Sequence, residues 1–118
     1  MAVEEHLKGW GKELWIANSE LYCGKKLVLT KGKKCSVHFH KKKDETFFVQ
    51  AGLVEMRTFP TGFPGEQKTV LLKPGDNFHI PVGTIHQFFG IEDSEIFEFS
   101  TQHFEEDSHR LAPGDSQK

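Results

Sequence analysis

Nine short apolar or alternating runs recur along the chain, and turn-forming residues close each of them. The runs cover residues 13–18, 26–30, 35–40, 45–50, 53–59, 68–72, 77–81, 86–91 and 95–100. Gly, Pro and Asp dominate the segments between them and readily adopt turn dihedrals. None of the runs keeps a 3.6-residue period, so little helix is expected. Because closely spaced antiparallel strands in 118 residues must cover their apolar faces, the predicted fold is all-β, a small antiparallel β-barrel or jelly roll.

Length and charge narrow the class of protein. A chain of this length predicts one domain over residues 1–118. A formal net charge of −2 gives no general attraction to nucleic acid or to an anionic membrane, so neither partner is expected. No segment resembles a secretion signal or a membrane span, which favours the cytoplasm. The polar end of the chain, residues 103–118, is expected to pack only partly, or to order on a ligand or a second subunit.

Cys23 and Cys35 are the two cysteines of the chain. They lie twelve positions apart without a C-x-x-C pattern, so they are typical of ordinary thiols in a reducing compartment. The sequence also allows a single bridge between them.

Two histidines, His38 and His40, flank Phe39 in one of the expected strands. Side chains at i and i+2 of a strand point to the same face, so the two imidazoles emerge together. That geometry can hold a metal ion. Paired strand histidines also occur as hydrogen-bonded or solvent-facing groups, so the pair alone leaves both interpretations open.

Glycines, prolines and further ligand-type residues surround this pair at fixed spacings. The anchors are Gly32, His38, His40, Glu45, Gly52, Gly75, Pro81, Gly83 and His86. They form two blocks, residues 32–52 and 75–90, that resemble the two motifs of the cupin superfamily, G-x5-H-x-H-x3-4-E-x6-G and G-x5-P-x-G-x2-H-x3-N. The only departure is Gly90, which stands where the second motif ends in Asn.

The resemblance implies a cupin barrel that binds one divalent transition metal. The implied ligands are His38, His40, Glu45 and His86. Glu45 is expected to reach the site through a hairpin across residues 41–44. Three imidazole nitrogens and one carboxylate oxygen suit Mn, Fe, Zn, Ni or Co, and the ligand set does not choose among them. An empty barrel that keeps only the fold is the alternative.

Flanking residues resemble the cupin domain of bacterial type II mannose-6-phosphate isomerases. The similar segments are KGWG at 8–11, the lead-in to His40, IPVGTIHQ at 80–87, IFEFS at 96–100 and EDSHRL at 106–111. His38 stands where that family often has Gln, Gln87 where it has Arg, and the chain lacks its D-Y-G-R ending. The complete ligand set is also similar to cupin isomerases of unphosphorylated aldoses, such as D-lyxose isomerase. A sugar or sugar-phosphate substrate is implied, with isomerase or epimerase chemistry.

Such an isomerase needs a metal that binds the substrate's O1 and O2, and a base that moves the C2 proton. Glu98 is the candidate base. It faces inward only if Phe97 and Phe99 face outward, and burial preference alone favours the opposite arrangement. The resemblance restores an even balance. Arg110 is a candidate clamp for a sugar oxygen or phosphate, with a surface ion pair as its alternative.

Several other residues carry a functional and a structural interpretation. His79 lines the cavity or faces outward. The lysines at 41–43 could attract an anionic ligand, but a solvated charge run is the favoured interpretation. Trp10 and Trp15 could stack on a sugar ring, but closing the core of the barrel is the favoured interpretation.

Two rival functions remain open, an Fe-dependent dioxygenase and a non-catalytic carbohydrate-binding cupin. A homodimer is expected because it would cover exposed sheet edges.

Overall fold

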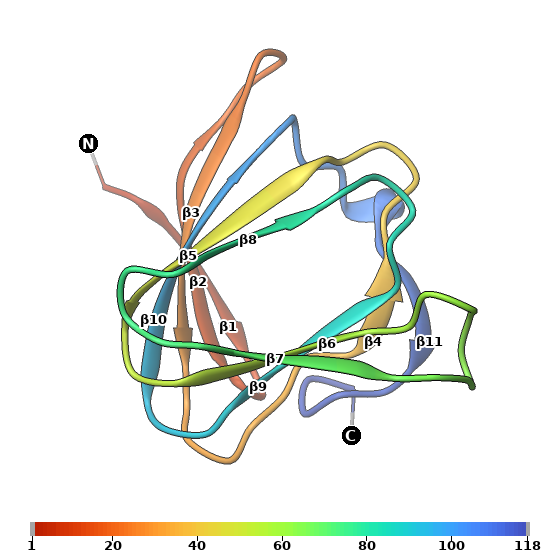
Figure 1. The fold of residues 1–118 in the computed structure, drawn as a ribbon. Helices are drawn as coiled ribbons and strands as arrows, with labels where there is room; N and C mark the ends of the chain where they lie inside the picture. Colours follow the sequence, from red (N-terminus) through yellow and green to blue (C-terminus); the bar gives the residue numbers. More distant parts are fainter. Residues whose placement is uncertain (1, 118) are drawn as a thin grey trace.

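The computed structural model describes residues 2–117. Its strands are β1 (Glu4–Lys8), β2 (Gly11–Asn18), β3 (Cys23–Leu29), β4 (Val37–Phe39), β5 (Glu45–Ala51), β6 (Val54–Thr58), β7 (Lys68–Leu72), β8 (Asn77–Ile80), β9 (His86–Gly90), β10 (Ser94–Ser100) and β11 (His109–Ala112), with one 3-10 turn, η1 (Glu105–Asp107). Figure 1 shows them curving into a barrel. The predicted all-β fold is confirmed. All nine expected runs contain a strand, and the sequence interpretation missed β1 and β11, which are short and polar.

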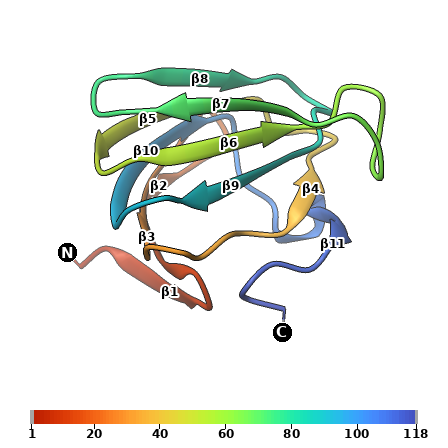
Figure 2. The ribbon, with the colours of Figure 1, turned by 60° about the horizontal axis from the view of Figure 1, so that its bottom comes forward.

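Two antiparallel sheets form the barrel. One has six strands in the order β1-β2-β3-β10-β5-β8, and the other has five in the order β11-β4-β9-β6-β7. Figure 2 shows the strands of the two sheets facing each other. In β3, β5 and β10, alternate residues are buried, as expected where one sheet face covers the core. None of the described residues belongs to a helix long and apolar enough to cross a membrane.

Apolar side chains from both sheets meet inside the barrel. They are Trp10, Leu27, Leu29, Cys35, Phe47, Val49, Val54, Met56, Leu72, Ile80, Phe88 and Ile96, with Phe78 packed against them. Trp10 therefore closes the core, as favoured. Cys23 and Cys35 are buried free thiols, so the structure contains no bridge between them.

The connection at residues 41–44 differs from the prediction. β4 lies in the five-stranded sheet beside β11 and β9, whereas β5 lies in the six-stranded sheet beside β10 and β8. The segment therefore crosses from one sheet to the other, and the expected hairpin is wrong. A four-residue connection is long enough for either arrangement, so its length did not distinguish them.

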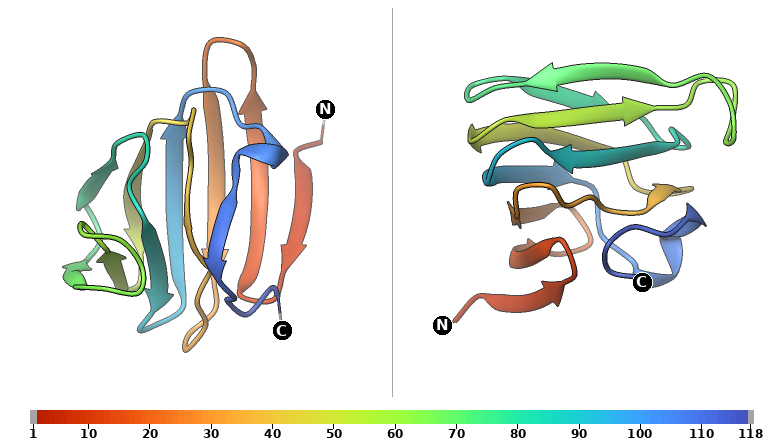
Figure 3. Two further views of the ribbon diagram at one scale, coloured as in Figure 1. Left: turned by 90° about the vertical axis from the view of Figure 1, so that its right-hand side faces the viewer. Right: turned by 90° about the horizontal axis from the view of Figure 1, so that it is seen from below.

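The C-terminal segment contacts the barrel at a few specific points. β11 pairs with β4, the Asp115 amide donates to the Lys34 carbonyl (3.0 Å), and the Gly9 amide donates to Ser116 Oγ (2.9 Å). In Figure 3 this dark blue segment lies across from the red N-terminal strands. Asp107 and Gly114 are buried, and the other described residues of the segment are half-buried or exposed, so the segment packs only partly against the barrel.

Candidate metal centre

Three histidines from neighbouring chain segments converge at one end of the barrel interior. His38 on β4 lies directly opposite His86 on β9, and His40 follows β4. One nitrogen of each ring lies within 4.8 Å of one nitrogen of the others, a spacing that one metal ion can bridge. His40 and His86 are buried, and His38 is partly buried. The strand pairing thus brings the first and second motifs together.

The hydrogen bonds of these rings orient them for metal binding. Each Nδ1 lies near a backbone carbonyl: Ser36 O for His38 (2.8 Å), Asp107 O for His40 (3.0 Å) and Thr84 O for His86 (2.9 Å). Because a carbonyl only accepts, each Nδ1 carries the proton. In a neutral ring with this tautomer, the lone pair lies on Nε2, which is the form that binds a metal.

Glu45, the first residue of β5, places its carboxylate beside these rings. Its Oε2 lies 3.1 Å from His40 Nε2, and its Oε1 lies 3.9 Å from His86 Nε2. Glu45 Oε2 and His86 Nε2 are buried and have no hydrogen-bond partner among the described residues. Buried polar atoms are rarely left unpaired. A cation between them would satisfy both, so the donor set fits a divalent transition metal.

Electrostatics keep these groups in their ligand forms. Burial, together with the neighbouring imidazoles, holds the pKa of His38 well below its usual value. Burial also lowers the pKa of His86, although Glu45 opposes this. Burial alone would raise the pKa of Glu45, but the contact with His40 and the charge of Lys43 outweigh it and lower that pKa. Neutral His38 and His86 beside the Glu45 carboxylate are therefore favoured at neutral pH.

Glu98 points into the same cavity from β10. It is 4% exposed, whereas Phe99 is 57% exposed and Phe97 is half-buried. The burial preference that favoured the phenylalanines inside is therefore wrong here. Glu98 Oε2 accepts hydrogen bonds from Lys43 Nζ (3.0 Å) and Ser100 Oγ (3.1 Å). These donors supply the polar surroundings that a buried carboxylate requires.

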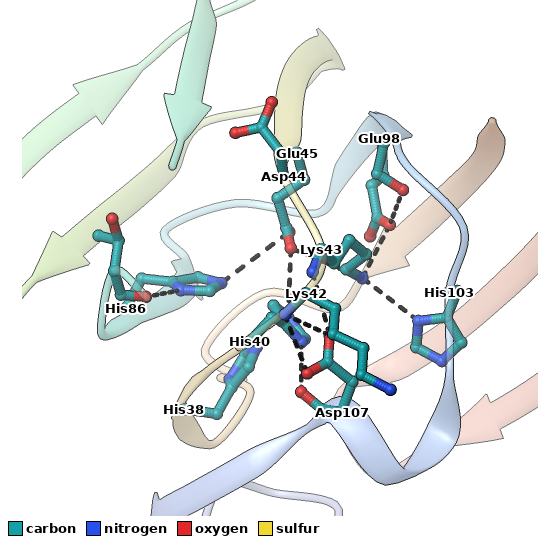
Figure 4. Close-up of polar contacts among 12 residues, drawn as sticks. His38, His40, Lys42, Lys43, Asp44, Glu45, His86, Glu98, His103 and Asp107 are labelled. Carbon is teal, nitrogen blue, oxygen red and sulfur yellow. Dashed lines mark hydrogen bonds and ion pairs between the residues drawn. The ribbon is translucent and has the colours of Figure 1, made fainter. Parts of the chain in front are cut away.

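The lysines at 41–43 were expected to be solvated, and this is wrong for Lys43. Lys41 and Lys42 are exposed, but Lys43 is only 4% exposed. Its Nζ lies 3.5 Å from Glu45 Oε2, in addition to its bond to Glu98. Burial alone would lower the pKa of Lys43, but Glu98 and Glu45 outweigh it and raise that pKa. Lys43 thus links the candidate ligand Glu45 to the candidate base Glu98 (Figure 4).

Two further polar residues were not identified from the sequence. Lys25 on β3 is 2% exposed, and its Nζ donates to Glu13 Oε1 (3.3 Å). Lys25 shares the inward face of β3 with Leu27 and Leu29, so strict alternation along that strand could have found it. His103 lies 3.3 Å from Lys43 Nζ through its Nδ1. It follows β10 outside any periodic run, so nothing in the sequence marked it.

The remaining candidates occupy different places. Arg110 is exposed on β11, opposite His38 in the strand pairing, and lines the cavity. His79 faces outward and pairs with Asp44 (2.7 Å), away from the three histidines. Trp15 is covered: His6 of β1 stacks on its ring (4.1 Å between centroids), and Lys25 Nζ of β3 lies 4.4 Å from the ring centroid. Trp15 therefore offers little open ring face for a sugar.

His38, His40, Glu45 and Arg110 line a cavity of about 80 Å³. A single buried water needs roughly 10–15 Å³, so the cavity has room for a small ligand group beside an ion. Its polar walls include Glu13, Lys25, Lys43, Glu98 and His103.

Comparison with known proteins assigns the family. Residues 22–116 match the family described as Cupin. The chain belongs to the cupin family. It is 31% identical over 119 residues to a D-lyxose ketol-isomerase of Thermofilum sp. (strain ex4484_79), which covers 82% of this cupin and 66% of the relative. This cupin thus spans slightly less than two thirds of that relative's length.

Two solved structures show the same fold. The capsular polysaccharide assembling protein CapF of Staphylococcus aureus matches 95% of this chain with a TM-score of 0.81 at 17% identity, and the chain spans 32% of CapF. KdgF from Halomonas sp. matches 87% of this chain with a TM-score of 0.70 at 19% identity, and 89% of KdgF is covered. At such low identities, these similarities show the fold alone.

Proposed function

We propose that this cupin is a metal-dependent isomerase of a sugar or sugar phosphate, or an epimerase of similar chemistry. The observation that carries the proposal is the placement of two buried carboxylates with different partners in one cavity. Glu45 lies against the three histidines, while Glu98 lies beyond Lys43. The similarity to a D-lyxose ketol-isomerase supports the same substrate class.

The proposed ligands are His38, His40, Glu45 and His86, and Mn, Fe, Zn, Ni and Co all suit them. A bound ion would supply Lewis-acid chemistry to adjacent substrate oxygens. The protein residues then divide the remaining work. Glu98 removes the proton next to the substrate carbonyl and returns it to the neighbouring carbon. Arg110, at the cavity wall, binds a substrate oxygen or phosphate.

Lys43 has a supporting role in this scheme. Its ammonium lies 3.0 Å from Glu98 Oε2 and 3.5 Å from Glu45 Oε2, so it holds the two carboxylates at a fixed separation. Without this cation, two buried carboxylates would repel each other and favour a shared proton. The lysine therefore offsets the repulsion between the two carboxylates.

Hydrogen exchange into the substrate tests the proposal directly. The metal-loaded protein is incubated in D2O with aldoses, ketoses and their phosphates, and proton NMR is recorded after the ion is removed. Deuterium at C1 or C2 is expected for at least one substrate. Glu98→Gln should abolish this exchange, whereas Glu95→Gln, on the outer face of the same strand, should retain it. Equal exchange in both variants would exclude Glu98 as the base.

The rival functions give different results in the same experiment. A protein that binds iron, consumes O2 and catalyses no exchange would be a dioxygenase. A protein that binds sugars without exchange or O2 consumption would be a carbohydrate-binding cupin. Either result would replace the isomerase proposal.

We also propose a homodimer, in a cytoplasmic setting. Leu7, Ile16 and Phe99 are 80%, 56% and 57% exposed on strands of the six-stranded sheet, and burial against a second copy would cover them. The two free thiols are consistent with a reducing compartment. Sedimentation analysis should give a dimer for the wild type and a monomer for Phe99→Lys. A monomeric wild type would refute the dimer. A single domain over residues 1–118 remains a prediction.

A further inference from the structure

Asp107, at the end of η1, anchors the connection between the two sheets. Its Oδ1 accepts hydrogen bonds from the amides of Lys41 (2.8 Å) and Lys42 (3.2 Å). Its Oδ2 accepts from the amides of Lys42 (3.2 Å) and Lys43 (3.1 Å). The residue is 3% exposed. Burial alone would raise the pKa of Asp107, but these three amides outweigh it and lower that pKa.

The backbone of the same residue contacts a candidate metal ligand. The carbonyl oxygen of Asp107 accepts a hydrogen bond from His40 Nδ1 (3.0 Å), as described above. The segment that its carboxylate holds, residues 41–43, runs from His40 to Glu45, another candidate ligand. Asp107 therefore contacts His40 itself and the segment that leads from His40 toward Glu45 (Figure 4).

Asp107 also fixes the chain that follows it. β11 begins two residues later and pairs with β4, and Phe39 stacks on His109 (5.1 Å between centroids). Ser108 and Arg110 line the cavity. One residue thus joins the C-terminal cavity wall to the imidazole that faces the ion site.

We propose that Asp107 is a positioning residue that couples docking of residues 105–112 to metal binding at His40. This inference rests on the proposed metal site. The carbonyl of Asp107 selects the His40 tautomer whose Nε2 lone pair is free, and the carboxylate keeps that carbonyl in place. Coupling between two such events is reciprocal. A metal that binds the docked arrangement therefore stabilises the docked segment, and a loosened segment weakens metal binding.

The chain offers a matched control. Asp115 lies in the same C-terminal segment, and its Oδ2 accepts a hydrogen bond from the Lys34 amide (2.7 Å). This contact also joins the segment to the barrel through a backbone amide, but Lys34 is not a candidate ligand. Asp107→Asn and Asp115→Asn therefore make the same chemical change at two anchors, and only the first lies against the ion site.

Metal affinity distinguishes the two anchors. Zn²⁺ and Co²⁺ dissociation constants are measured by competition with a chromogenic chelator in the full-length protein. Asp107→Asn should weaken binding about 10–100-fold, the range typical of residues that orient metal ligands. Asp115→Asn should remain within about threefold of the wild type. An unchanged affinity in Asp107→Asn, or an equal loss in both variants, would overturn the coupling.

Hydrogen exchange of the wild type provides a test that needs no variant. Amides of β11 should exchange at least about tenfold more slowly with Zn²⁺ than without it, while amides of β7, far from the site in the same sheet, should change little. In Asp107→Asn, if it folds, this metal dependence should shrink. The ring ¹⁵N shifts of metal-free His40 should show protonated Nδ1 in the wild type and a mixture of tautomers in the variant, which a general loss of stability would not produce.

The outcomes separate this inference from the proposal it rests on. A wild type that binds none of these ions overturns both the metal site and the coupling. Metal binding without any protection of β11 overturns the coupling alone and leaves the isomerase proposal intact.

Discussion

The two halves of the barrel interior are built on the same strands and have opposite compositions. On β3, Leu27 and Leu29 follow Lys25 on one face, and on β10 Ile96 is followed by Glu98. All of these side chains are buried on the inner face of their strands, and the change from apolar to charged residues occurs within two to four positions. The strand geometry therefore decides which residues point inward. The residue types decide whether their burial stabilises or destabilises the folded protein.

In the apolar half, each buried side chain contributes roughly 1.5–3 kcal/mol. In the ionisable half, burial is unfavourable unless each charge finds a partner. Lys25 pairs with Glu13, and Lys43 pairs with Glu98. Glu45 Oε2 and His86 Nε2 are buried and lack a hydrogen-bond partner among the described residues, although Lys43 Nζ lies 3.5 Å from Glu45 Oε2. In the ionisable half, the buried lysines are thus neutralised by neighbouring carboxylates, and the buried atoms without a hydrogen-bond partner lie at the proposed metal site.

The largest effect is expected for a change in the ligand group. His40→Ala should lower metal affinity by more than the about 100-fold that is the upper range for orienting residues, because it removes a proposed ligand itself. Chelator competition and metal analysis of the purified protein measure this. In the apolar half, Ile96→Ala should cost about 2–5 kcal/mol of stability, yet leave metal affinity nearly unchanged. Unchanged metal content in His40→Ala would refute the ligand assignment.

The second effect concerns the buried ion pairs. Lys25→Met should destabilise the metal-free protein by about 3–5 kcal/mol, because Glu13 would remain as an uncompensated, largely buried charge. Urea unfolding at neutral pH measures the loss. Adding Glu13→Gln should recover most of it, since no lone charge remains. A double variant as unstable as Lys25→Met would show that the lysine acts through packing instead.

The sequence predicted the apolar half better than the ionisable half. Alternation and turn residues are local signals, and they located β2 to β10. The i, i+2 rule correctly placed His38 and His40 on one face, since their ring centroids lie 5.0 Å apart. These inferences use only neighbours in the chain, so they need no knowledge of the fold.

The failures within the polar end of the barrel involve partners far apart in sequence. Lys43 is buried because Glu98, 55 residues away, accepts a hydrogen bond from its ammonium. Glu98 in turn points inward, against average burial preferences, because that end of the barrel is polar. The C-terminal segment docks because Asp107 finds amides 64 to 66 residues away. No local pattern encodes such pairs, so only the three-dimensional structure reveals them.

The third prediction concerns the pH dependence of the ionisable half. Burial beside Lys25 and Lys43 lowers the pKa of His103 from 6.5 to about 3, although Glu13 opposes this. Glu105 also faces its Nε2 at 3.7 Å. Between these pH values the unfolded chain binds a proton that the folded protein does not, so stability falls as the pH falls. One such group contributes up to about 1.4 kcal/mol per pH unit.

His103→Gln should therefore reduce the slope of unfolding free energy against pH between pH 6 and pH 4, measured by urea unfolding of metal-free protein at about half-unit steps. The lowered pKa values of His38 and His86 also contribute to the slope, but equally in both proteins. The difference between the two curves thus isolates His103. Parallel curves would show that His103 takes up a proton in the folded state as readily as in the unfolded chain.

The smallest effect is expected for Lys26, the neighbour of Lys25 on β3. Its side chain points to the outer face, where Nζ pairs with Glu95 at 2.6 Å, and the two side chains are 30% and 41% exposed. Exposed pairs contribute about 0.2–1 kcal/mol, because water already solvates both charges. Lys26→Met should therefore change the unfolding free energy by less than about 1 kcal/mol, measured under the same conditions as Lys25→Met. Since the two lysines are adjacent and undergo the same substitution, only the direction of the side chain differs. Equal losses in the two variants would mean that the charge of the strand, and not burial, sets its stability.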